Sequence, residues 1–108
     1  MQMPKPGPKT LERFERVASA LSDLGVVRGA MFGMPMLKTG KRVFAGIYGD
    51  AMTFKLAPED LATALAITGV EPFEPMAGRA MKEWVLVPLA RSRRWPALAE
   101  QARRYVAG

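Results

Sequence analysis

One arginine of this sequence is a candidate for binding an anion. Arg79 directly follows Gly78 in the segment EPFEPMAGRAMKEW (71–84), where two prolines stiffen the chain and the glycine allows a tight turn. A guanidinium group is a natural clamp for a carboxylate or a phosphate, because its planar fork donates parallel hydrogen bonds. The alternative, which we favour, is that Arg79 ties down its own loop by binding carbonyl groups or neighbouring glutamates.

A second candidate is the side of a predicted strand that carries two aromatic residues. Phe44 and Tyr48 flank Gly46 at alternate positions, and the predicted hairpin register places Lys55 opposite Phe44. Aromatic side chains on a sheet beside a cation can stack nucleic-acid bases. We favour the alternative that another helix or a second subunit covers this face, because the sequence contains no RNA-binding motif of the RNP type.

The methionines form a third candidate. Six of the eight gather around the predicted hairpin and the loop that follows: Met31, Met34, Met36, Met52, Met76 and Met81. Methionine is flexible and polarisable, so it forms adaptable binding surfaces and also fills gaps in cores. Because several of these residues alternate along predicted strands, we expect core positions.

The net charge of +6 is concentrated at the two ends of the chain. The first sixteen residues contain four basic and two acidic side chains, and the last eighteen contain five arginines against one glutamate. If the ends meet in space, they form one basic patch that attracts phosphate groups. The candidate residues are Arg13, Arg16, Arg91, Arg93 and Arg94. The favoured alternative is an ordinary solvated surface.

Composition argues against the commonest catalytic and metal sites. The sequence contains no cysteine and no histidine, which removes thiolate nucleophiles, zinc–thiolate sites and the usual general base near neutral pH. Two carboxylate pairs, Glu59-Asp60 and Glu71 with Glu74, lie where a helix start or a turn explains them. No glycine-rich phosphate loop is present. We therefore expect no catalytic residues, no cofactor and no bound metal.

The elements that must position these residues follow from hydrophobic spacing and from glycine and proline breaks. Apolar residues at helical spacing predict a first helix over residues 11–24, with Thr10 as its N-cap and Gly25 after its end. Pro35 makes the first predicted strand, 30–37, an edge strand or a bulged one. The remaining predicted elements are strands 42–48 and 51–56, a helix 58–68, a short strand 70–74, a strand 82–87 and a helix 94–107.

The dipeptide Gly49-Asp50 predicts a tight hairpin turn, and this turn fixes the register of the two strands that it joins. The predicted core face is entirely apolar and consists of Val43, Ala45, Ile47, Met52, Phe54 and Leu56. The opposite face is mixed and partly open, and consists of Phe44, Gly46, Tyr48, Thr53 and Lys55. The strand 82–87 is apolar on both sides, so we expect it to be central and Trp84 to be buried.

Together these elements predict an α+β fold of two layers, with an antiparallel sheet and the helices against one face. At 108 residues the chain fits one domain, residues 10–108, after a disordered lead-in of residues 1–9. No signal peptide and no apolar run of membrane-spanning length is visible in the sequence. We therefore expect a cytoplasmic protein.

Short blocks in fixed order carry a resemblance to a known family. The matching positions are Met31-Phe32-Gly33, Glu71-Pro72-Phe73, Gly78-Arg79 and Met81, in the segments MFGMPMLKTGKRVFAGIYGD and EPFEPMAGRAMKEWVLVP. With a final helix bearing Trp95, the similarity extends over residues 11–106. The chain resembles the N-terminal domain of the TfoX/Sxy family. The resemblance implies a small α+β domain similar to type III secretion chaperone-like and YjbR-like proteins.

The TfoX family is named for bacterial regulators of natural competence, which act on transcription together with other regulators and carry a second, C-terminal domain. The resemblance implies regulation and binding rather than chemistry, and it carries over no catalytic residues. We expect a stand-alone regulatory or protein-interaction domain without that second domain, with an unidentified protein partner and with a homodimer also compatible. The alternative is a nucleic-acid-binding protein that uses the basic terminal helices, with weak and non-specific binding.

Overall fold

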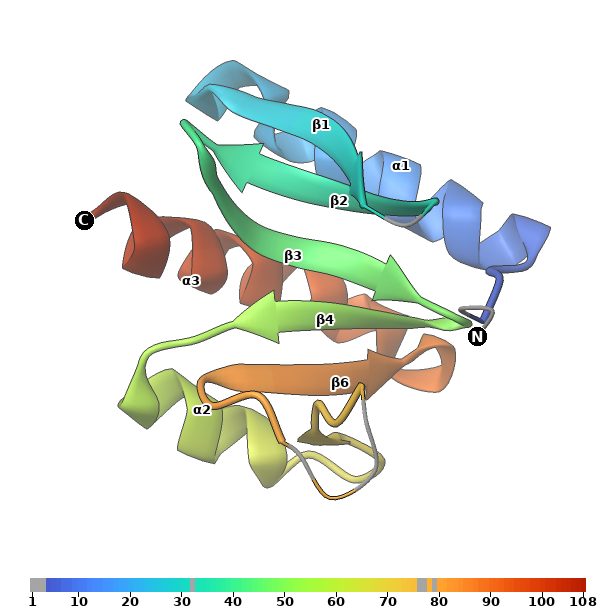
Figure 1. The fold of residues 1–108 in the computed structure, drawn as a ribbon, viewed down its shortest axis with the longest axis vertical. Helices are drawn as coiled ribbons and strands as arrows, with labels where there is room; N and C mark the ends of the chain where they lie inside the picture. The colour runs from blue at the N-terminus through green and yellow to red at the C-terminus, as the bar shows by residue number, and fades with distance from the viewer. Residues whose placement is uncertain (1–3, 32, 76–77, 79) are drawn as a thin grey trace.

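The computed structural model describes residues 4–31, 33–75, 78 and 80–108, and these form an α+β fold around one six-stranded antiparallel sheet (Figure 1). The strand order is β1-β2-β3-β4-β6-β5. The strands are β1 Val26–Met31, β2 Met34–Thr39, β3 Arg42–Tyr48, β4 Ala51–Lys55, β5 Glu71–Pro72 and β6 Trp84–Pro88. The helices are α1 Pro8–Leu21, η1 Ser22–Leu24, α2 Pro58–Leu65, η2 Leu89–Arg94 and α3 Trp95–Ala107, where η marks a 3-10 helix.

The helices α1 and α3 lie side by side against one face of the sheet, which confirms the predicted two-layer arrangement (Figure 1). The helix α2 packs beside β6 at one edge. Within the described part of the chain, no helix covers the opposite face of the sheet (Figure 1). We call this opposite face the open face; its residues include Met36, Val43, Gly46, Tyr48, Thr53 and Trp84.

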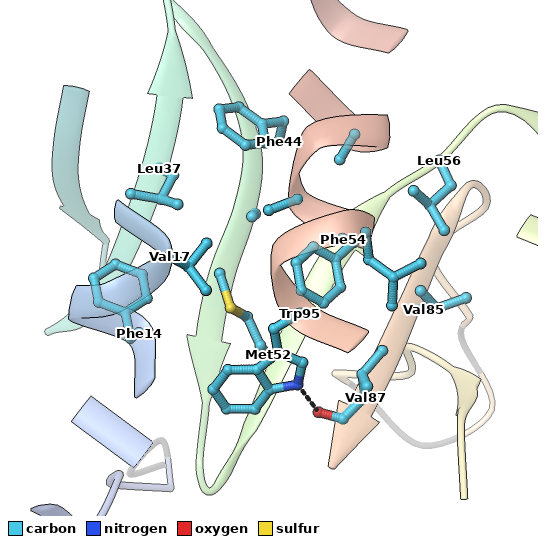
Figure 2. Close-up of a cluster of buried hydrophobic side chains, with 14 of the residues drawn as sticks. Phe14, Val17, Leu37, Phe44, Met52, Phe54, Leu56, Val85, Val87 and Trp95 are labelled. Atoms are coloured by element: carbon cyan, nitrogen blue, oxygen red, sulfur yellow. Dashed lines mark hydrogen bonds between the residues drawn. The ribbon is translucent and has the colours of Figure 1, made fainter. Parts of the chain in front are cut away.

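The core lies between the sheet and the helices, and Trp95 is one of its largest side chains (Figure 2). Trp95 is completely buried at the start of α3, and its indole Nε1–H donates to the carbonyl oxygen of Val87 at 3.2 Å. Phe14 and Val17 of α1 pack into the same cluster. Because its one polar atom is hydrogen-bonded, Trp95 contributes a large apolar area to the core without leaving an unsatisfied donor.

The predicted register of the β3–β4 hairpin is confirmed from the turn to the pair Ala45–Phe54, whereas the predicted pairing of Phe44 with Lys55 is not formed. Gly49 has a φ of 60°, a conformation that glycine adopts without steric cost in the first position of a tight hairpin turn. The paired residues are Tyr48 with Ala51, Ile47 with Met52, Gly46 with Thr53 and Ala45 with Phe54. Period-two alternation therefore places Ile47, Met52 and Phe54 in the core as predicted.

The prediction failed at the start of β3, where the strand contains one extra residue. Leu37 of β2 pairs with Ala45, but the next β2 residue, Lys38, pairs with Val43, so Phe44 has no partner in the ladder. Such a bulge breaks the alternation of side chains. Phe44, predicted on the open face, is completely buried beside α3 (Figure 2), and Val43, predicted in the core, is half-buried on the open face.

The predicted strand 30–37 is in fact parts of two strands. Gly33, with a φ of 80°, lets the chain reverse so that Met31 of β1 pairs with Met34 of β2. β2 is an interior strand, although Pro35 predicted an edge or a bulge. The proline is tolerated because pairing of β2 with β3 begins only at Met36, so no ladder bond to β3 needs its missing N–H group.

The start of α1 also differs from the prediction. The helix begins at Pro8, so residues 8 and 9 are helical rather than part of a lead-in, and Thr10 is not the N-cap. Thr10 is instead completely buried and donates its hydroxyl to Asp50 Oδ1 at 2.6 Å. The same oxygen accepts the backbone N–H of Gly7 at 2.8 Å. Asp50, at the tip of the β3–β4 hairpin, therefore holds the beginning of α1.

Trp84 is not a core residue, because β6 has two different sides. Val85 and Val87 are completely buried, whereas Trp84 is half-buried on the open face. β6 has β4 on one side and only the two-residue β5 on the other. The remaining boundaries differ modestly: α2 ends at Leu65 rather than near 68, and α3 begins at Trp95.

The two tryptophans provide a test of this assignment. We expect Trp95→Ala to lower the free energy of unfolding by about 3–5 kcal/mol, as large truncations in cores do. Trp84→Ala removes a half-exposed ring and should cost about 1–2 kcal/mol. Urea unfolding of both variants and of the wild type measures the difference. Equal losses would contradict the placement of one ring in the core and the other on the open face.

The Asp50 contacts predict a pH dependence of stability. The hydroxyl of Thr10, followed by the N–H of Gly7, lowers the pKa of Asp50 below the ordinary aspartate value. A lowered folded-state pKa stabilises the protein above the unfolded pKa, and this stabilisation is lost as pH falls through the folded pKa. Asp50→Asn should therefore lower the urea midpoint at neutral pH. In acid, below the ordinary aspartate range, the two midpoints should converge; a constant difference would rule out this linkage.

Candidate functional site

A pocket of about 310 Å³ opens on the open face of the sheet. Its lining is almost entirely apolar and includes Met31, Met34, Met81, Tyr48, Phe73 and Trp84. Met31 and Met81 are 48% and 42% exposed, values more typical of a contact surface than of a core. We call this feature the methionine pocket.

The floor of the methionine pocket is hollow because its central residue has no side chain. Gly46 pairs with Met36 of β2 on one side and with Thr53 of β4 on the other. A Cβ atom placed on Gly46 would lie 3.4 Å from the Pro35 carbonyl oxygen and 3.5 Å from Met36 Cβ, which are ordinary contacts. The φ of Gly46 is not positive, so its backbone conformation does not require glycine, and the missing side chain leaves space in the pocket that Gly46 lines.

One wall of the methionine pocket is a loop held by its own backbone. Phe73 N–H donates to the Trp84 carbonyl oxygen at 3.1 Å, and Met81 N–H donates to the Phe73 carbonyl oxygen at 2.9 Å. The ring of Phe73 meets that of Tyr48 edge to face, with centroids 5.1 Å apart. These contacts hold Phe73 and Met81 beside Trp84 and Tyr48 at the methionine pocket.

A second, polar pocket of about 500 Å³ lies where β3 and β4 diverge, and Arg42, Lys55, Glu83 and Tyr105 line it. The last pair that joins these strands is Ala45 with Phe54, beyond which their ends separate (Figure 1). Val43 lines both this polar pocket and the methionine pocket. The bulge at Phe44 therefore brings the two pockets together.

Glu83 and Tyr105 form the back of the polar pocket. Glu83 is the single non-glycine residue with positive φ, 75°, among the described residues. The Tyr105 hydroxyl donates to Glu83 Oε2, and this hydrogen bond is the main reason that the pKa of Tyr105 is raised. The N–H of Leu56 donates to the Glu83 carbonyl oxygen at 2.8 Å. Backbone strain of this kind persists only where the surroundings hold it.

The structure brings together some of the predicted binding residues and separates others. Tyr48 lines the methionine pocket and Lys55 lines the polar pocket, whereas Phe44 belongs to the core. Gly78 is exposed with a φ of 77°, which only glycine adopts freely. Arg79 lies outside the described residues.

The expected core role of the methionines is confirmed for Met52 and Met36, which are buried, although Met36 also lines the methionine pocket. It is wrong for Met31, Met34 and Met81, which line this pocket and are at least partly exposed. Met76 lies outside the described residues. Sequence reasoning missed Trp84 as a pocket residue, because Trp84, Val85, Leu86 and Val87 are all apolar and only their burial in the structure alternates. Nothing in the sequence pattern pointed to Val43 or to the Glu83–Tyr105 contact.

The basic candidates lie on the helix side of the molecule, and several are engaged. Arg16 pairs with Glu12 at 2.9 Å on the exposed side of α1. Arg91 Nε donates to the Thr68 carbonyl oxygen at 2.9 Å. Arg13 is half-buried, and Arg93 and Arg94 are exposed.

No protein-family model, curated protein or solved structure matches this chain. Among the described residues, no three acidic side chains are grouped so that they could hold a metal ion. None of the helices in the same part of the chain has the length and apolar character needed to cross a membrane.

Proposed function

We propose that this protein is a non-enzymatic binding domain for another protein, and that its methionine pocket receives a large apolar side chain of the partner. The observation that supports this proposal is an apolar pocket with a hollow floor on the face opposite the core. Concave apolar sites with few polar groups are the usual form of binding sites.

Two features favour binding over an incidental gap. Exposed methionines lie on both sides of the pocket, Met31 on β1 and Met81 on the loop before β6, and methionine adapts its shape to different partners. The floor residue, Gly46, lies inside a central strand, where glycine is less favourable for stability than alanine. In this proposal, the glycine is tolerated because it leaves space at the floor of the pocket.

The non-enzymatic part of the proposal is supported by the composition, because the sequence contains neither histidine nor cysteine. The resemblance to TfoX N-terminal domains adds a regulatory role, which is likewise part of the proposal. In this proposal the partner is a cytoplasmic protein whose binding changes the activity of a larger regulatory system.

A plugged pocket tests the proposal. We expect Gly46→Leu to fill the hollow and to weaken the binding of the neutral fluorescent probe N-phenyl-1-naphthylamine by about tenfold or more, since an apolar ring can then no longer be buried there. Peptides selected from a random displayed library on the wild type should carry a large apolar residue and should fail to bind the plugged variant.

Gly46→Ala is the matched control. It has a Cβ but leaves most of the hollow, so it should keep probe binding and be as stable as the wild type, or more stable by about 0.5–1 kcal/mol. Urea unfolding of both variants shows whether the fold is intact. If Gly46→Leu folds normally and still binds the probe and the peptides as the wild type does, the proposed role of the methionine pocket is refuted.

A second candidate function is nucleic-acid binding, and it is supported by the contacts of Asp50 with two distant segments of the chain. Gly7 N–H donates to the Asp50 carboxylate, and Leu89 N–H donates to the Asp50 carbonyl oxygen at 3.0 Å. The beginnings of α1 and η2 therefore meet, which brings Lys9 and the arginines of η2 to one end of the molecule. Such a patch attracts phosphate without reading sequence.

Salt dependence tests this second function. We expect random-sequence double-stranded DNA to bind with a dissociation constant of about 1–100 μM near physiological salt, and the binding to fall steeply as salt rises. Replacing Lys9, Arg93 and Arg94 by glutamine should reduce the salt slope by about one for each phosphate that is no longer neutralised. Lys82→Gln, in the loop before β6, is the control. A slope unchanged by the triple replacement would exclude this patch.

A further inference from the structure

We infer that the partner segment carries a carboxylate beside its apolar side chain, and that the polar pocket between the diverging ends of β3 and β4 receives this carboxylate. The inference rests on the proposed function of the methionine pocket. It adds the chemical identity of the partner: a protein segment in which an acidic group lies next to a large apolar residue.

The two pockets are adjacent through two independent links. Val43 lines both of them, because the bulge at Phe44 turns it to the open face. In addition, Lys55 of the polar pocket pairs with Trp84 of the methionine pocket across β4 and β6. A side chain seated against Trp84 therefore places the neighbouring groups of its own chain next to Lys55.

The polar pocket offers cationic donors with capacity left for a ligand. Lys55 is half-buried and forms no ion pair within the described residues. Arg42 donates one Nη1–H to the Val106 carbonyl oxygen at 3.1 Å, which leaves other N–H groups of its fork. Hydrogen bonds from such groups to a carboxylate are charge-assisted and stronger than neutral ones.

Glu83, the one carboxylate among the described residues that line the polar pocket, is already hydrogen-bonded. Glu83 accepts the hydroxyl of Tyr105, and its backbone is held in a left-handed conformation. The negative charge of Glu83 still repels an anion bound in the same pocket, because the protein screens charges less than bulk water does. Removing that charge should therefore strengthen the binding of an anionic ligand, and removing Lys55 should weaken it.

Two probes with the same aromatic skeleton test the chemistry directly. N-phenyl-1-naphthylamine is neutral, and 8-anilinonaphthalene-1-sulfonate adds one anionic group. We expect Lys55→Gln to weaken the binding of the sulfonate probe by about three- to tenfold, as removal of one charge-assisted hydrogen bond does, and to leave that of the neutral probe unchanged. Glu83→Gln should strengthen the binding of the sulfonate probe and leave that of the neutral probe unchanged, whereas a loosened fold would expose apolar surface and strengthen the binding of both probes.

The controls separate this inference from the proposed function. Gly46→Leu should weaken the binding of both probes, and Lys9→Gln, on the far side of the sheet, should change neither. If the neutral probe does not respond to Gly46→Leu, the proposed function itself fails. If it does respond, but the sulfonate probe is insensitive to Lys55→Gln and Glu83→Gln, only the carboxylate site is overturned.

Peptide selection identifies the source of the ligand. Two displayed libraries present a fixed tryptophan, one flanked by aspartate and glutamate and the other by asparagine and glutamine. The acidic library should be enriched on the wild type and lose this enrichment on Lys55→Gln. Equal enrichment of both libraries would overturn the inference. Dimerisation in sedimentation experiments that the neutral probe abolishes would assign the pocket to a second copy of this chain and also overturn it.

Discussion

The extra residue in β3 is the constraint on which both pockets depend. Because Phe44 has no partner in the ladder with β2, it turns into the core beside α3, and Val43 turns to the open face. Pairing between β3 and β4 stops at Ala45 and Phe54, so the strand ends separate. A regular ladder would have left Phe44 on the open face, with no polar pocket beside it.

The two faces of the sheet differ in packing and composition. On the helix side, completely buried side chains such as Trp95 and Phe54 pack between the sheet and two helices, and this packing supplies most of the stability. The open face contains a glycine, a threonine and exposed methionines, which contribute less. The proposed binding face and the core therefore lie on opposite sides of the sheet.

Asp50 links two segments that are far apart along the chain. Its carboxylate holds the beginning of α1 through Gly7 and Thr10, and its carbonyl oxygen holds the beginning of η2 through Leu89. Gly49 adopts the positive φ that the hairpin turn requires. The side chain of Asp50 is therefore available to accept hydrogen bonds from α1. The same anchor brings Lys9 and the arginines of η2 toward one end of the molecule.

The sequence by itself determined the α+β class, the helix stripe of Phe14 and Val17, and the register set by Gly49-Asp50. Each of these depends on local periodicity or on a turn that specific residues require. It also identified Tyr48, Lys55 and the methionines as candidates for a binding face, although it favoured a core role for the methionines.

Only the tertiary structure decided which tryptophan is buried, which side Val43 and Phe44 face, and that Glu83 meets Tyr105. Trp84 and Trp95 are equally apolar in sequence, and burial depends on which neighbours arrive from distant elements. A bulge inserts one residue without changing composition, so periodicity cannot locate it. The sequence pattern indicates which side chains are apolar, and the packing of distant segments determines which of them are buried.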